Sequence, residues 1–161
     1  MANENEKMIW NEILKLQLDG VMMHTAMFEK YLLNNLKGYA CLHKYHAKEE
    51  YCSYLSTLCI FIESFEEVPE IPQIIAPVVQ LEGSTVEEKM IKGIETYKNW
   101  EMNVFNKLKD YQKESLENSD CLKKLIRGVQ EELKCINLME NDLLSEKYEE
   151  LDKWLIKKMG D

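Results

Sequence analysis

The sequence predicts an all-α protein: a bundle of four long helices with a long crossover between the second and third helices and a short C-terminal fifth helix. Two observations support this prediction. Apolar residues recur at steps of three and four along four segments, which is the spacing of one face of an α-helix. Glycine and proline, which interrupt helices, number only 6 and 3, and the three prolines fall in one stretch. Long uninterrupted helices are therefore favoured over a sheet.

The first helix is expected over about 6–36. Its inward face repeats over six turns and contains Trp10, Ile13, Leu14, Gln17, Gly20, Val21, His24, Met27, Phe28 and Tyr31. Gly38 interrupts the pattern, and the short turn that it implies makes the next helix antiparallel to the first. The second helix is expected over about 39–65, and one line along it contains Leu42, His46, Glu50, Ser53, Thr57 and Ile60.

The stretch 66–85 is expected to connect the two halves of the bundle without forming a helix. It contains Pro69, Pro72 and Pro77, a late glycine and several β-branched residues. A segment of this length without a helix is unusual inside a compact domain, and it normally crosses the length of the structure. The run from Ser84 to Glu88 then supplies an N-cap and early acids for the third helix.

The third, fourth and fifth helices are expected over about 86–116, 121–144 and 146–159, with Asn118, Ser119 and Asp120 capping the fourth. The third helix has a stripe of Met90, Ile94, Tyr97, Glu101, Val104, Leu108 and Tyr111. The fourth has Leu125, Val129, Glu132, Ile136, Met139 and Leu143, and the fifth has Tyr148, Leu151, Trp154 and Leu155. We expect one domain over 1–161.

Charge and cysteine content exclude some classes of protein. The formal net charge of −9 gives no reason to expect nucleic acid or an anionic membrane as a partner. The first residues, MANENEKM, lack the basic and apolar runs of a signal peptide, and no segment reaches transmembrane length. Five cysteines without a CxxC pair indicate reduced, buried thiols in a cytoplasmic protein.

Each of the four stripes carries at least one polar residue among its apolar ones. These residues are Gln17 and His24, then His46, Glu50 and Ser53, then Glu101, and finally Glu132 with Cys135 three residues later. A buried acid is costly unless it is paired, hydrogen-bonded or bound to a metal. One acid or imidazole from each helix is also what a metal site inside a four-helix bundle requires.

The run HAKEEYCS at 46–53 makes the chain resemble the ferritin and bacterioferritin-like superfamily, over nearly its full length. In that superfamily the run continues as Glu-x-x-His, and both residues are ligands of the ferroxidase centre. Here the glutamate is kept as Glu50, whereas Ser53 stands in place of the histidine. His46, four residues before the glutamate, also resembles the family pattern.

The resemblance implies where the other ligands fall. The first-helix glutamate of the family falls on Gln17, and a tyrosine that hydrogen-bonds the site falls on His24. The third-helix glutamate falls on Glu101, and the fourth-helix glutamate falls on Glu131 or Glu132. Helical phase favours Glu132, because Glu131 shares its side of the helix with lysine and arginine and is expected to be solvated.

Two functions follow from this incomplete ligand set. The first is a ferritin-like iron protein that assembles as a dimer or a larger homo-oligomeric shell, with a weakened or lost ferroxidase centre. Glu50, Glu101, Glu132 and Gln17 would then be its ligands. Alternatively, Glu50, Glu101 and Glu132 without an imidazole would hold one cation weakly. The second is a non-catalytic structural bundle that binds no metal, in which an internal polar network includes His24 and His46. His43 is expected beside the stripe and partly exposed, and Cys135 is expected to be a small core residue.

Overall fold

The computed structural model describes residues 4–70, 79–114, 116–144 and 148–159. Its helices are α1 (Glu4–Leu33), α2 (Lys37–Phe65), α3 (Val86–Tyr111), α4 (Ser119–Leu144) and α5 (Tyr148–Met159). The central part of the crossover, residues 71–78, and the predicted start of the fifth helix lie outside the described residues. The side chains of Leu143 and Tyr148, which the stripes of the sequence include, also lie outside them.

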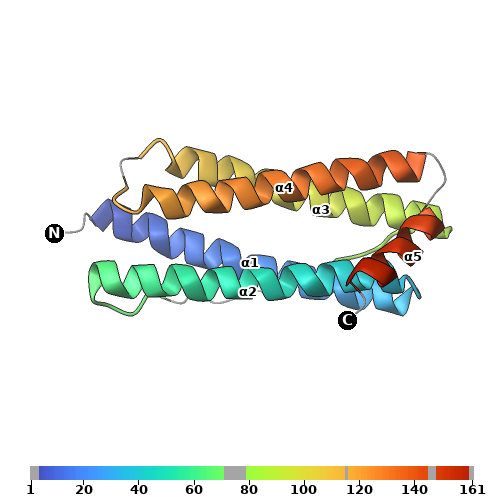
Figure 1. The fold of residues 1–161 in the computed structure, drawn as a ribbon, viewed down its shortest axis with the longest axis horizontal. Coiled ribbons are helices and arrows are strands. Elements are labelled where there is room, and N and C mark those ends of the chain that lie inside the picture. Colours follow the sequence, from blue (N-terminus) through green and yellow to red (C-terminus); the bar gives the residue numbers. More distant parts are fainter. Residues whose placement is uncertain (1–3, 71–78, 115, 145–147, 160–161) are drawn as a thin grey trace.

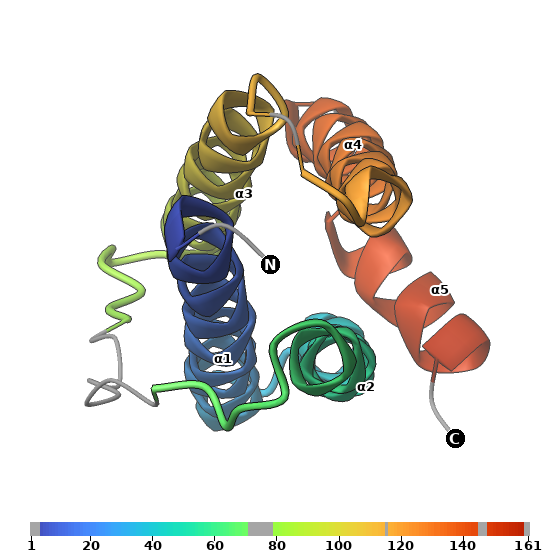
Figure 2. The same cartoon turned by 90° about the vertical axis from the view of Figure 1, so that its left-hand side faces the viewer.

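The four long helices run side by side along the longest dimension of the molecule (Figure 1). The first two form one closely packed pair, α1 with α2, and the next two form the other, α3 with α4. The short helix α5 crosses one end of the bundle and packs against α2 (Figure 2). The predicted all-α bundle with a short fifth helix is therefore confirmed.

The turn between α1 and α2 differs from the predicted one. The helix α1 ends at Leu33, and the chain reverses at Asn35, whose φ of 59° lies in the left-handed region. Asparagine tolerates this conformation better than most residues. The prediction that Gly38 interrupts the helices was wrong, because Gly38 lies inside α2 and is buried. Its lack of a side chain instead allows the backbone of Asp152 in α5 to approach closely.

The start of α3 follows the prediction, and its end does not. Thr85 accepts a hydrogen bond from the Glu88 backbone N–H at 3.2 Å, and the Glu88 carboxylate accepts one from the Thr85 N–H at 3.1 Å. The prediction extends this helix to 116, whereas α3 ends at Tyr111. After it, Glu114 N–H donates to the carbonyl of Tyr111, so the chain tightens into three-residue turns that bring Leu116 into the core.

The apolar interior forms two clusters separated by polar residues. The cluster at the α5 end includes Met27, Tyr31, Tyr39, Met90 and Ile136. The cluster at the opposite end includes Trp10, Ile13, Phe61, Leu108 and Leu122. Between them along each of the four long helices lie the polar residues of the stripes. The middle of the bundle is thus the place where buried acids and histidines meet.

The cysteines are less buried than the sequence predicted. All five cysteines are free, but none is fully buried, and Cys52 and Cys59 are exposed on the outer face of α2. The expectation of buried thiols was therefore wrong. Its physical reason is helix phase: both residues lie on the side of α2 that no other described helix covers. In the described part of the chain, no helix is long and apolar enough to cross a membrane.

Candidate metal centre

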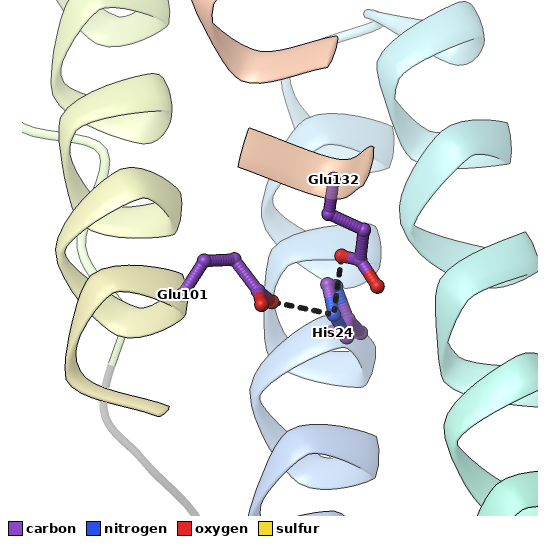
Figure 3. Close-up of side chains that lie close together, drawn as sticks. All are labelled: His24, Glu101 and Glu132. Atoms are coloured by element: carbon purple, nitrogen blue, oxygen red, sulfur yellow. Dashed lines mark ion pairs between the residues drawn. The ribbon is translucent and has the colours of Figure 1, made fainter. Parts of the chain in front are cut away.

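Three side chains from three helices converge in the middle of the bundle (Figure 3). The Nε2 atom of His24, on α1, lies 3.6 Å from Oε1 of Glu101, on α3. The same Nε2 atom lies 4.0 Å from Oε2 of Glu132, on α4. One ligand atom from each residue lies within 4.8 Å of the other two. The stripes of three separate helices therefore bring one imidazole and two carboxyl groups to a common point.

Burial leaves this group short of hydrogen-bond partners. His24 and Glu101 are 0% and 1% exposed, and the side chain of Glu132 is mostly buried. Neither Nε2 of His24 nor Oε1 of Glu101 has a hydrogen-bond partner. A buried polar atom without a partner costs about 1–3 kcal/mol. A cation bound between these two atoms would remove that cost for both.

Protonation in this group is also set by burial. Burial, and then the neighbouring His43 and His46, hold the pKa of His24 well below its usual range, so its imidazole is neutral at neutral pH. Burial raises the pKa of Glu101, and the charges of Glu132 and Glu50 raise it further. In the metal-free protein Glu101 therefore holds a proton at neutral pH. A divalent cation would displace that proton, because a metal ligand must be deprotonated.

The helix α2 contributes a second imidazole, from His46, and a third acid, the partly buried Glu50, beside this group. The Nδ1 atom of His46 lies 3.7 Å from Oε2 of Glu132. Glu50 lies against Gly20 of α1, where an added methyl group would come within 3.3 Å of its carboxyl carbon. Burial, with the charges of Glu132 and Glu49, raises the pKa of Glu50 to about 8. Tyr97 donates a 2.6 Å hydrogen bond to Glu132 and so holds that carboxylate in place.

Gln17 and Ser53, the two positions at which the resemblance predicted that a ligand is replaced, contact each other directly. Gln17 donates hydrogen bonds to the hydroxyl oxygens of Ser53 at 2.9 Å and of Thr57 at 3.0 Å. Gln17 precedes His24 by seven residues, and Ser53 follows His46 by seven, which is about 10 Å along a helix. The imidazole-bearing group is therefore displaced by two turns from the Gln17–Ser53 pair.

His43 lies beside His24 in the interior, contrary to the prediction from the sequence. It was expected to be partly exposed, but it is 1% exposed, and its Nδ1 atom lies 3.0 Å from Nδ1 of His24. The reason is helix geometry, since His43 is three residues before His46 and side chains three apart share a face. That spacing was the signal available in the sequence.

The remaining candidate residues occupy the edge of the centre or lie outside it. Glu132 points into the bundle, whereas Glu131 is exposed to solvent. Cys135 is half-buried, and burial raises the pKa of its thiol, so it remains protonated. A cavity of about 250 Å³ lies beside the centre, and its lining includes Gln17, Glu50, Ser53, Gly128 and Glu132.

A bundle of four long helices with a short fifth one, and with acids and histidines meeting at its middle, defines a ferritin-like fold. A solved structure described as a humanized archaeal ferritin has this fold, with a TM-score of 0.80 over 96% of this chain and 97% of that chain. The two sequences are 16% identical, so the likeness concerns the fold. No protein-family model matches the sequence, and no curated protein matches it. The predicted ferritin-like fold is confirmed.

Proposed function

We propose that this ferritin-like protein binds one divalent transition-metal ion between His24, Glu101 and Glu132. The observation that carries the proposal is the convergence of three ligand atoms within 4.8 Å, two of them buried without hydrogen-bond partners. One imidazole with two carboxylates suits Fe²⁺, Mn²⁺ or Zn²⁺. His46 and Glu50 lie close enough to the centre to serve as further ligands or to hold the first three in place.

Iron is the metal that the ferritin-like fold favours, and here it would be a substrate or cargo rather than a fixed cofactor. Oxidation of two irons requires ligands for both. Gln17 offers a neutral amide and Ser53 a hydroxyl, and these two groups are hydrogen-bonded to each other. We therefore propose that the ferroxidase centre is weakened or lost. Ferrous iron added in air should oxidise no faster with the protein than with the Glu132→Gln variant.

We further propose that the chain assembles with copies of itself, as a dimer or a larger shell. The support is a row of exposed apolar side chains along the outer face of α2, which includes Tyr45, Leu55 and Ile62 at 44%, 42% and 44% exposure. Burial of such side chains between copies is favourable. Light scattering tests the proposal, and a mass equal to the 19.0 kDa of one chain would contradict it.

One observation favours the alternative of a structural bundle that binds no metal. Tyr97 donates to Glu132, and Gln17 donates to Ser53 and Thr57, so part of the buried polar network is satisfied without an ion. A protein of this kind would keep its stability in chelator. It would also gain no stability from any of the three metals.

Thermal unfolding without oxygen separates the two functions, and neighbouring glutamates provide a matched pair of variants. Fe²⁺, Mn²⁺ or Zn²⁺ at 100 times its Kd should stabilise the wild-type protein by about 2.7 kcal/mol, because the ion binds only the native state. Glu132→Gln removes a proposed ligand and should abolish this stabilisation. Glu131→Gln changes an exposed acid at the next position and should keep it. Equal responses from the two variants would reject this binding site.

A further inference from the structure

We propose that His43 is a positioning residue that fixes the tautomer of His24. In this arrangement Nδ1–H of His24 donates to Nδ1 of His43, and the Nε2 lone pair of His24 points toward Glu101 and Glu132. The inference deepens the proposed metal-binding function and rests on it. It adds a residue, His43, that contacts the proposed ligand His24.

The imidazole of His24 makes a short polar contact with the imidazole of His43 through its Nδ1 atom. The two Nδ1 atoms lie 3.0 Å apart, which is hydrogen-bond distance. His24 and His43 are 0% and 1% exposed. At this distance there is room for only one proton between the two nitrogens, so one Nδ1 carries it and the other accepts it. The two possible directions of this bond place the free lone pair of His24 at different atoms.

The opposite side of the His24 ring distinguishes the two directions. If His43 donated, His24 would carry its proton on Nε2, where the nearest carboxyl oxygens lie at 3.6 Å and 4.0 Å. These distances exceed the range of a hydrogen bond, so a fully buried N–H would have no acceptor. With the proton on Nδ1, the Nε2 lone pair instead faces two acids at the spacing of ligands that each lie about 2.1 Å from one ion.

His43 is itself held in place by aromatic rings. Tyr31 stacks on it, with ring centroids 5.3 Å apart and planes 15° from parallel. Tyr97 meets it edge-on at 4.8 Å. Because Tyr97 also donates to Glu132, the same tyrosine orients one proposed ligand directly and borders the residue that orients another. A ligating histidine usually makes such a bond through its second nitrogen, and loss of the partner typically weakens metal binding by about 10–100-fold.

The test measures the tautomer first, in metal-free protein, by nitrogen NMR of the histidine rings. We expect the proton of His24 on Nδ1 in the wild type. His43→Phe keeps a ring between Tyr31 and Tyr97 but removes the acceptor, so the proton should move to Nε2. His43→Asn keeps an acceptor near the position of Nδ1 and should retain the wild-type tautomer.

Zinc binding to the same three proteins is measured second, by calorimetry. His43→Phe should weaken zinc binding by about 10–100-fold, and His43→Asn should restore most of it. A wild-type His24 protonated on Nε2 would overturn the inference, as would a His43→Phe variant with unchanged tautomer and affinity. If zinc does not bind but the proton is on Nδ1, the metal-binding function fails while the assignment of the tautomer stands. Should His43→Phe fail to fold, the wild-type spectrum alone still decides the tautomer.

Discussion

The surroundings of a single residue in the centre change its pKa, and the effect on stability can be tested at Glu50. Its pKa is raised from about 4.5 to about 8, first by burial and then by the charges of Glu132 and Glu49. Between these pH values the folded state binds more protons than the unfolded state. Stability must therefore fall as pH rises through this window. His24 and His43 act in the opposite sense, but only below pH 6.5, since their pKa values are lowered.

The prediction concerns metal-free protein in chelator between pH 6.5 and pH 8. Replacement of Glu50 by Gln removes its titration, so the variant should lose about 1–2 kcal/mol less stability over this range than the wild type. Denaturant unfolding at several pH values gives the measurement. Glu131→Gln serves as the control, because that acid is exposed. Parallel curves for wild type and Glu50→Gln would show that Glu50 is ionised throughout.

The packing of the long helices can be tested at two glycines, Gly93 and Gly128, that lie inside helices. A methyl group added at Gly93 of α3 would overlap the ring and hydroxyl of Tyr31, whereas one added at Gly128 of α4 would meet no atom within 4 Å. Both Gly→Ala changes gain about 0.5–1 kcal/mol of helix propensity. At Gly93 the overlap costs about 1–3 kcal/mol and displaces the ring that stacks on His43.

The same substitution should therefore have opposite effects at the two positions. Gly128→Ala should raise the free energy of unfolding, and Gly93→Ala should lower it, as measured by denaturant titration. A gain in stability at both positions would show that α1 and α3 are not packed as closely as the contact between Tyr31 and Gly93 requires.

The position of a helix can be predicted from the sequence where the residues that start or end it are neighbours in the chain. Thr85 and Glu88 form a capping box within four residues, so the start of α3 needed no information from elsewhere. The turn after α1 could not be placed this way. Gly38 has the local character of a helix break, but its small size serves a contact with Asp152, which is 114 residues away in the chain.

Part of the centre could also be predicted from local signals in the sequence. Helical phase indicated that Glu101 and Glu132 face inward, since each helix repeats its own pattern. The partner of each acid depends on how far one helix slides along the next, and a single stripe does not contain that register. The meeting of His24 with His43, and of Gln17 with Ser53, arises from the packing of α1 on α2.

At the scale of the whole molecule, α5 is joined to the bundle because its Asp152 side chain caps the N-terminus of α2. The first backbone N–H groups of α2 have no partner inside that helix, and its N-cap position, Leu36, makes no side-chain cap. The Oδ1 atom of Asp152 accepts the backbone N–H of Tyr39 at 3.0 Å, and Gly38 also donates its N–H to this carboxylate. A negative charge at a helix N-terminus is favourable as well.

Removal of this carboxylate should loosen α5 without unfolding the bundle. Asp152→Ala should cost about 1 kcal/mol, the usual effect of losing a helix cap, and Asp152→Asn should cost less because an amide oxygen still accepts. Hydrogen exchange should become faster in α5 and in the first turn of α2, whereas the middle of α3 should stay protected. Lys153→Ala, at the exposed neighbouring position, should change neither. Unchanged exchange in Asp152→Ala would mean that apolar contacts, such as that of the buried Leu155, hold α5 in place by themselves.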